Sequence, residues 1–528
     1  MLLGQLTRKT YKFLKKNMIM IKNFKWLLLV SLTFVACNSD DAVVVVSNSS
    51  DGLPLTAGVA NFSKYVALGN SLTSGYSDGA LFIEGQKVSY TNIMAQKFAT
   101  VGGGDFKIPF MADNIGGFKI NGTQFAGARL ASSGGGAPIP VSGTPSTEIL
   151  NPAVAAAGPY NNCGVAGAKS YHLLSPTYGS PAGLSVGTAN PYYVRFAPNG
   201  TTSVLAYAMS QKPTFFSLWI GNNDVLGYAT TGGDGTDPIT PSAGAAGVGF
   251  DATFDALVNT LTSGGVKGVI ANIPYVNTLP FFTFIAANPV PLNAGQVAQL
   301  NPLFGAMNSI LASASQPARF QTLTVSATNP LLIADKMLAY DATALFTAAF
   351  QGAPFNYPAA TAGFLGNLYG KARHASNATA TRDYVLLTAG GSIGTSQAGF
   401  PATSSTIGVT YPMADKAILT ASEVALVKTA TDAYNAKIKA VANAKGLAFV
   451  DANALMSQVS TGGFSANGFT VTGAFITGGG FSTDGVHPSP RGYAMLANKF
   501  MQAINTTYGS NLKAVDLGNY RILFPKSL

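Results

Sequence analysis

Charged residues, cysteine and histidine are all scarce in this chain of 528 residues. Only 10% of the residues are charged whereas 47% are hydrophobic, so the chain can bury a sizeable core and is not a disordered acidic or basic polymer. Two cysteines exclude a disulfide-built scaffold and a cysteine-based zinc cluster. Three scattered histidines do not form a metal-ligand set either. The composition therefore predicts a large globular protein without a metal or other cofactor.

The net charge of +10 does not indicate a nucleic-acid partner, because most of it lies at the N-terminus. Residues 1–36 contain seven Lys or Arg and no acidic residue, and without them the balance is +3. No basic cluster is visible elsewhere in the sequence. DNA and RNA binding are therefore not expected.

The N-terminal segment has the order of a secretion signal. A basic stretch precedes the apolar run Trp26–Ala36, which is too short to span a bilayer and is followed by Cys37. This order resembles a bacterial lipoprotein signal peptide, in which Cys37 would become the lipid-modified first residue. The alternative is an ordinary cleaved signal with a chance cysteine. Translation starts at Met1, Met18 or Met20, because each leaves a basic segment before the apolar run.

Residues 37–58 are expected to form a tether between the lipid and the folded part. Ser39-Asp40-Asp41 resembles the acidic surface-export tags of Bacteroidota lipoproteins. We therefore expect a bacterial envelope protein, an outer-membrane lipoprotein facing the periplasm or the surface. No other segment of the sequence suggests a membrane span.

The remainder alternates between short apolar strands and amphipathic helices. Strands are predicted at Lys64–Leu68, Thr214–Ile220, Val266–Ile273 and Gly446–Asp451. Helices are predicted at Ala252–Ser263, Ala421–Ala444 and Pro490–Ile504. This alternation predicts an α/β fold with a mainly parallel sheet covered on both faces. In such sheets the reactive groups lie in loops at the carboxyl ends of the strands.

We expect one domain over residues 59–505, followed by a C-terminal tail over 506–528. The long segments that are poor in charge and show no fixed repeat are interpreted as insertions into this domain, at about 101–160, 228–250 and 277–415. The alternative is a separate binding domain within 277–415.

One histidine stands beside a carboxylate at a useful spacing. Asp484 and His487 lie three residues apart, just before the helix that Ser489 should cap and Pro490 should begin. At this spacing the carboxylate can accept a hydrogen bond from Nδ1, so that Nε2 can take a proton. The pair is therefore a candidate acid and base.

Ser71 is the candidate nucleophile. It follows a predicted buried strand and Gly69, which permits the tight turn that exposes a hydroxyl at the sheet edge. The site is not the nucleophile elbow of α/β-hydrolases, because Thr73 stands where that motif requires its second glycine.

Four blocks, in order, resemble the motifs of the SGNH (GDSL) hydrolases. They are Gly69-Asn-Ser-Leu72, Asn162-Cys-Gly-Val-Ala-Gly167-Ala-Lys-Ser170, Gly221-Asn-Asn-Asp224 and Asp484-Gly-Val-His487. Asn114-Ile-Gly-Gly117 is a weaker contender for the second block. The resemblance covers most of residues 60–505 and implies a flavodoxin-like α/β/α core with large loop insertions. Single blocks are weak evidence, whereas four in order are specific.

The resemblance also implies a role for each matching residue. Ser71 would attack an ester carbonyl, His487 would act as base and then as acid, and Asp484 would orient His487. The backbone N–H groups of Ser71 and Gly167 and the side-chain amide of Asn223 would hold the oxyanion. The sequence departs from the family at Asn70, where the family has Asp; the amide keeps the shape and one acceptor but loses a charge.

Other residues that could carry chemistry have structural interpretations. His172 and His374 have no comparable partners, and Cys163 should be a small buried thiol. The segment Gly164–Ser170 lacks the glycine spacing of a phosphate-binding loop. Asp234-Gly-Thr-Asp237 is interpreted as a solvated turn rather than a calcium site.

These observations predict a serine esterase or lipase that hydrolyses carboxylic esters through an acyl-enzyme. Its substrate would be an acyl lipid or an O-acetylated glycan, and its rate should rise with pH over about pH 5 to 9 as the histidine base loses its proton. The alternative is a non-catalytic envelope lipoprotein that uses the same scaffold to bind glycan or lipid. The sequence does not indicate an oligomeric state.

Overall fold

A parallel five-stranded sheet lies at the centre of the computed structural model, which describes residues 54–134 and 136–528. The signal peptide, Cys37 and most of the tether fall outside the described residues. The strands in spatial order are β15 (Ala448–Val450), β8 (Lys267–Ala271), β7 (Phe215–Trp219), β1 (Tyr65–Gly69) and β6 (Asn162–Gly164). Counted along the chain this order is 2-1-3-4-5, which is one of the common orders of doubly wound sheets.

The strands form where the sequence has unbroken apolar runs, because a sheet covered on both faces buries every side chain. All five residues of β1 and of β7 are buried, and the two strands pair in register from Tyr65↔Phe215 to Gly69↔Trp219. The four predicted strands are therefore confirmed, with their ends shifted by one or two residues. The α/β class with a parallel sheet is confirmed as well.

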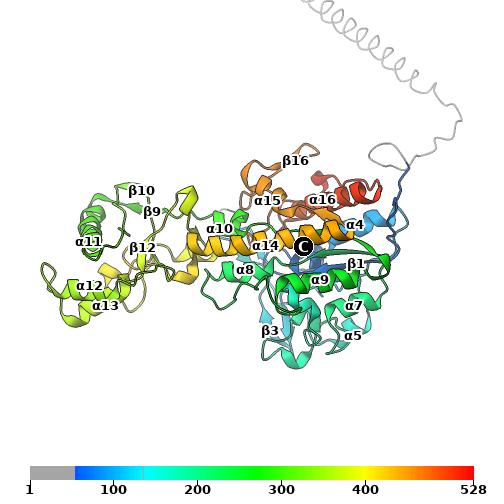
Figure 1. The fold of residues 1–528 in the computed structure, drawn as a ribbon, viewed down its shortest axis with the longest axis horizontal. Helices are drawn as coiled ribbons and strands as arrows, with labels where there is room; N and C mark the ends of the chain where they lie inside the picture. The colour runs from blue at the N-terminus through cyan, green and yellow to red at the C-terminus, as the bar shows by residue number, and fades with distance from the viewer. Residues whose placement is uncertain (1–53, 135) are drawn as a thin grey trace, which may run out of the picture. The chain divides into compact units, whose positions relative to one another are not determined.

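Helices flank the sheet. They are α2 (Ser71–Ser74), α3 (Ile83–Lys87), α4 (Tyr90–Ala99), α6 (Pro191–Val194), α7 (Val204–Ser210), α8 (Asn223–Thr230), α9 (Phe250–Leu261), α14 (Ala421–Lys445), α15 (Ala452–Thr461) and α16 (Pro490–Tyr508). The Phe500 ring of α16 packs against Trp219 of β7 at 5.6 Å and Tyr90 of α4 at 4.6 Å. Phe250 of α9 stacks on Tyr434 of α14 at 4.0 Å, and these two helices run side by side in Figure 1.

The capping residues of α14 and α16 determine where these two helices begin and end. Ser489 accepts a hydrogen bond from the backbone N–H of Gly492, and Pro490 is the first helical residue, as predicted. The helix ends at Tyr508 rather than at the predicted Ile504, because the left-handed residue that stops it is Gly509 (φ 69°). Gly446 (φ 60°) ends α14 in the same way.

The segment between α4 and β6 forms small peripheral elements. These are β2 (Phe118–Ile120), β3 (Thr123–Ala126), β4 (Leu130–Ala131), β5 (Ile139–Pro140) and α5 (Pro152–Ala156). The first two strands pair with each other, as do the next two. Another hairpin, β16 (Phe464–Ala466) with β17 (Phe469–Val471), follows α15.

The longest segment outside the sheet lies between β8 and α14. Its elements are α10 (Pro280–Thr283), β9 (Val290–Leu292), α11 (Ala294–Ser313), β10 (Ser326–Asn329), β11 (Leu332–Ala334), α12 (Thr343–Gln351), α13 (Ala359–Tyr369), β12 (Ala372–His374), β13 (Tyr384–Val385) and β14 (Ile418–Leu419). A bridge between Ile285 and Val385 brings the two sides of this excursion together. Its buried apolar residues are continuous with the central core, and Leu55–Leu528 belong to one compact unit.

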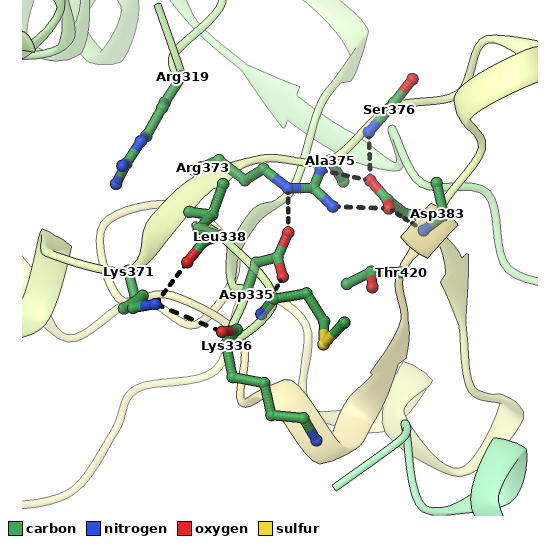
Figure 2. A network of polar contacts seen from close by, with 12 residues as sticks. Arg319, Asp335, Lys336, Leu338, Lys371, Arg373, Ala375, Ser376, Asp383 and Thr420 are labelled. Atoms are coloured by element: carbon green, nitrogen blue, oxygen red, sulfur yellow. Dashed lines mark hydrogen bonds and ion pairs between the residues drawn. The ribbon is translucent and has the colours of Figure 1, made fainter. Parts of the chain in front are cut away.

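A buried ion-pair network ties this excursion to the start of α14 (Figure 2). The guanidinium of Arg373 donates to Asp335 at 2.6 Å and, through two nitrogens, to Asp383 at 2.6 and 2.8 Å. Asp383 also accepts a hydrogen bond from the backbone N–H of Ala421, the first residue of α14. The excursion therefore supplies an anionic partner to the N-terminus of a core helix.

Among the residues described, no helix is both long and apolar enough to cross a membrane.

Candidate active site

Ser71 stands at the carboxyl end of β1, as the first residue of α2. A Cβ atom at Gly69 would lie 2.4 Å from the carbonyl oxygen of Trp219, so only glycine permits this approach to β7. The Asn70 side chain caps α2 by accepting a hydrogen bond from the backbone N–H of Leu72 at 3.0 Å. The turn and the cap together hold the Ser71 hydroxyl at the edge of the sheet.

His487 and Asp484 lie in the loop before α16 and reach Ser71 from the other end of the chain. The Nε2 atom of His487 lies 2.8 Å from Oγ of Ser71, and its Nδ1 atom lies 2.8 Å from Oδ2 of Asp484. An ionised carboxylate can only accept, so Nδ1 carries the proton and Nε2 accepts from the Ser71 hydroxyl. In this tautomer His487 is oriented to take a proton from Ser71.

The Asp484 carboxylate is held by several donors. Its Oδ1 atom accepts from the backbone N–H groups of Val486 and His487, both at 2.8 Å, and its Oδ2 atom accepts from the N–H of Gly79 at 2.8 Å. Burial works to raise the pKa of Asp484, but the charge of His487 and these hydrogen bonds outweigh it and lower that pKa to about 2. Asp484 is therefore ionised at neutral pH.

The segment Tyr76–Gly79 also supports the loop that carries Asp484 and His487, and only a weak turn signal marks this segment in the sequence. The Oδ1 atom of Asp78 accepts from the backbone N–H of Thr483 at 3.0 Å and from its hydroxyl at 2.8 Å. Burial raises the pKa of Asp78 to about 6, and the Arg129 guanidinium lies 3.6 Å away. The one local signal is the turn-prone Asp78-Gly79 dipeptide, in which Asp78 has a φ of 53°.

Tyr76 covers one side of the His487 imidazole. Its ring centroid lies 4.6 Å from that of His487, and its backbone carbonyl accepts a hydrogen bond from the Tyr493 hydroxyl of α16 at 2.6 Å. The imidazole is thus held by packing as well as by Asp484.

The candidate oxyanion donors come from three loops. Among the described residues, the backbone N–H groups of Ser71 and Gly167 have no hydrogen-bond acceptor. The Asn223 amide donates one of its two hydrogens to the carbonyl of Ala168 at 2.9 Å, which leaves the other for a ligand. Ser71 and Asn223 line the same cavity. Gly167 does not line it, but it precedes Ala168, whose carbonyl accepts the hydrogen bond from Asn223.

The structure distinguishes between the two contenders for the second sequence block. Asn162–Gly164 form β6, which pairs with β1, and the N–H of Val165 donates to the carbonyl of Gly69 at 3.0 Å. Asn114–Gly117 instead precede β2, which is outside the central sheet. The block that contains Gly167 is therefore the one beside Ser71.

The Gly221–Asp224 block is connected to the other blocks by its side chains. The Asn70 amide donates a hydrogen bond to the Oδ1 atom of Asn222 at 3.1 Å. An ionised Asp at position 70 cannot donate, so it would have to accept a hydrogen bond from the Asn222 amide instead. The buried Asp224 accepts from the N–H and the hydroxyl of Ser170 at 2.8 and 2.7 Å. Burial raises the pKa of Asp224 to about 6.

The residues interpreted as structural have protein partners. Backbone N–H groups donate to Nδ1 of both His172 and His374, and burial lowers the pKa of each imidazole to about 4. Cys163 is a buried free thiol, as predicted, and burial raises its pKa to about 12. Lys169, from the segment that superficially resembles a phosphate loop, pairs with Asp237 at 2.5 Å. Within the described part of the chain, no group of three or more His, Cys, Asp or Glu could hold a metal ion.

A cavity of about 60 Å³ opens beside the side chains of Ser71 and His487. Ser71, His487, Asn222 and Asn223 contribute to its lining, and most of its remaining walls are apolar. A substrate group can therefore reach Ser71 from a space that is largely free of competing polar groups.

The chain matches no family model, and neither a curated protein nor a solved structure matches it.

Proposed function

We propose that this protein is a serine esterase of the SGNH type that hydrolyses carboxylic esters. One observation carries the proposal: Ser71, His487 and Asp484 form a continuous hydrogen-bonded chain, with 2.8 Å at each link, at the wall of an apolar cavity. This is the arrangement that activates a serine hydroxyl, because the base is within reach of the nucleophile and is itself oriented by a carboxylate.

In the proposed reaction, Ser71 Oγ attacks the ester carbonyl carbon while His487 Nε2 takes the hydroxyl proton. The negative charge that develops on the carbonyl oxygen is stabilised by the N–H of Ser71 and by the free N–H of the Asn223 amide, with Gly167 as a further donor. His487 then gives its proton to the departing alcohol, which leaves an acyl group on Ser71. Water, deprotonated by His487, releases the acid and restores the serine.

The topology supports the same proposal. The order 2-1-3-4-5 is that of flavodoxin-like sheets, and the four sequence blocks lie next to one another at the carboxyl ends of the core strands β1, β6 and β7 and in the loop before α16. Such a convergence of motifs far apart in sequence is what an SGNH core requires.

A fluorophosphonate probe tests the proposal without assuming a substrate. Residues 38–528 are treated with the probe and the modified residue is mapped by mass spectrometry. We expect labelling at Ser71, its loss in His487→Ala, and loss of ester hydrolysis in Ser71→Ala and His487→Ala with the far-UV circular dichroism spectrum unchanged. A folded protein that is not labelled, or a Ser71→Ala variant with full hydrolysis, would contradict the proposal and favour the binding-protein alternative.

We also propose that the enzyme is anchored to a bacterial envelope membrane through a lipid on Cys37. The support is the signal-like segment before Cys37 and the tether after it. Expression of the whole chain in a bacterial host should yield protein in the detergent phase of a Triton X-114 extraction. Cys37→Ser should move it to the aqueous phase; an unchanged distribution would argue against the anchor.

A further inference from the structure

The cavity beside Ser71 has an apolar end that the proposed chemistry does not use. Its deep wall consists of side chains from α8, α15, α16, the end of β7 and the loops that follow β8 and precede α16, each no more than 8% exposed: Trp219, Val225, Ile273, Met456, Phe481 and Leu496. The one polar side-chain atom among these residues, Nε1 of Trp219, already donates to the carbonyl of Asn272 at 3.0 Å. This end therefore offers no hydrogen bond to a ligand.

The polar groups of the cavity lining lie close together, because Asn70 bonds Asn222 and Ser71 bonds His487. They are the side chains of Asn70, Ser71, Asn222, Asn223 and His487. Half-buried apolar side chains, including Leu72, Leu226 and Val486, complete the lining. A molecule that fills the cavity is thus polar where it meets Ser71 and apolar elsewhere.

The size of the cavity limits what it can hold. A site for one water molecule needs roughly 10–15 Å³, so the 60 Å³ here corresponds to about four to six non-hydrogen atoms. Water is a poor occupant of the apolar end, because an ordered water needs two to four polar partners and the deep wall offers none. The space suits a short hydrocarbon chain.

We propose that this cavity receives the acyl part of the ester, and that the substrate carries an unbranched acyl chain of about four to six carbons rather than an acetyl group. The inference rests on the proposed esterase function. The acyl chain, not the alcohol, fits because the cavity ends against core side chains: an acyl chain terminates in a methyl group there. The alcohol of a lipid or a glycan continues into a larger molecule and needs an open path.

An acetyl group would leave most of the cavity empty. Each methylene that moves from water into an apolar site contributes a factor of about four in binding. Two added methylenes, from acetyl to butanoyl, should therefore raise kcat/KM about fifteenfold. An O-acetylated glycan gains no binding free energy from this wall, because an acetyl group has no methylene to bury. The cavity therefore favours esters of longer acyl chains over acetylated sugars.

The test compares p-nitrophenyl esters that share one alcohol and differ in acyl length, with residues 38–528 as the enzyme. We expect kcat/KM to rise about fifteenfold from acetate to butanoate, to peak at four to six carbons, and to fall for dodecanoate. A second series keeps the acetyl group and lengthens the alcohol, and it should show no such peak.

Variants of the cavity wall test its location. Leu226→Trp fills the cavity and should abolish the preference for butanoate over acetate, measured as the ratio of the two kcat/KM values. Met456→Ala enlarges the cavity and should shift the peak to longer chains. Leu365→Trp is the matched control, because Leu365 is a half-buried leucine of α13 that does not line the cavity, and it should leave the acyl profile unchanged.

Other outcomes would overturn the inference in distinguishable ways. If Ser71 is labelled by the fluorophosphonate but acetate is hydrolysed best, the esterase stands and the acyl-chain assignment fails. A peak of kcat/KM in the alcohol series instead of the acyl series would show that the cavity binds the alcohol part of the ester. If Ser71 is not labelled and no ester is hydrolysed, both proposals fail together.

Discussion

The charge on Asp484 links stability and the proposed activity at a single residue. Its pKa of about 2 in the folded protein lies below the ordinary value of 3.8, so the folded state favours the ionised form. A depressed carboxyl pKa stabilises the protein above the unfolded pKa, and this stabilisation is lost as pH falls from about 4 towards 2. The shift corresponds to about 2 kcal/mol at neutral pH.

We therefore expect Asp484→Asn to be less stable than the wild type at pH 6, with a gap that narrows as pH falls towards 2 in urea denaturation. The same variant should lose about 10³–10⁴-fold in kcat, because a neutral amide no longer holds the Nδ1–H tautomer of His487. If the difference in free energy of unfolding between the two proteins does not change with pH, folding does not favour the ionised form of Asp484.

Asn70 offers a second prediction at the scale of one residue. Asn70→Asp keeps the cap on the N–H of Leu72 and can accept from Asn222 once that amide turns, so kcat/KM should stay within about fivefold of the wild type. Asn70→Ala removes both contacts and should cost about 1 kcal/mol of stability and more than tenfold in kcat/KM. Equal activity of the two variants would show that the contact with Asn222 does not position Ser71.

The residues predicted from sequence are those whose chemistry is visible within a few positions. Asp484 and His487 are three residues apart, and Ser71 follows a glycine at the end of an apolar run. Asp78 and Arg129 give no such chemical signal, because their contacts with Thr483 and Pro525 span about 400 positions. Their contribution becomes visible only when the chain is folded.

At the scale of the element, the N-terminus of α14 depends on the ion-pair network of Figure 2. Arg373→Ala would leave Asp335 and Asp383 buried without their cation, and should lower the free energy of unfolding by about 3–5 kcal/mol. Arg373→Lys should lose less, because it keeps the charge but not the two-nitrogen contact with Asp383. Urea denaturation at pH 7 measures both.

The control for this prediction lies on the same helix. Lys428 and Asp432 form an exposed pair one turn apart on α14, and Lys428→Ala should change stability by less than about 1 kcal/mol. If Arg373→Ala lowers the free energy of unfolding as little as Lys428→Ala does, the ion-pair network does not stabilise α14.

The elements that the sequence predicted well are the buried and strongly patterned ones. The four predicted core strands are apolar runs, and α14 and α16 carry caps that can be recognised in sequence. The strands of the excursion between β8 and α14 are two to four residues long and lie in alanine- and threonine-rich sequence, so neither period nor composition marks them. The strand β6 was indicated only through its glycine block.

At the scale of the whole molecule, residues 524–528 support the loop that carries Asp484 and His487, through Arg129. The guanidinium of Arg129 donates to the carbonyls of Pro525 and Lys526, and the Phe524 ring packs edge-on against Phe82. Arg129 in turn faces Asp78, which holds Thr483. The sequence predicted a tail here but could not predict what it touches.

Deletion of residues 524–528 should therefore affect both stability and activity. We expect a loss of at least about 3 kcal/mol, because a buried phenylalanine and two partners of a buried guanidinium disappear, together with a lower kcat. Deletion of residues 527–528 alone leaves those contacts in place and should behave as the wild type. Thermal unfolding and ester hydrolysis measure the two effects, and equal behaviour of the two deletions would contradict this role of the tail.

The hydrogen bond between Ser71 and His487 joins residues that are 416 positions apart in the chain. A ribosome that adds about 5–20 residues per second needs roughly 20–80 s to make the histidine after the serine. During that interval the serine is an ordinary, unreactive alcohol. If the proposed function holds, the Ser71 hydroxyl can be activated only after His487 has been synthesised, and a product terminated before His487 should not hydrolyse esters.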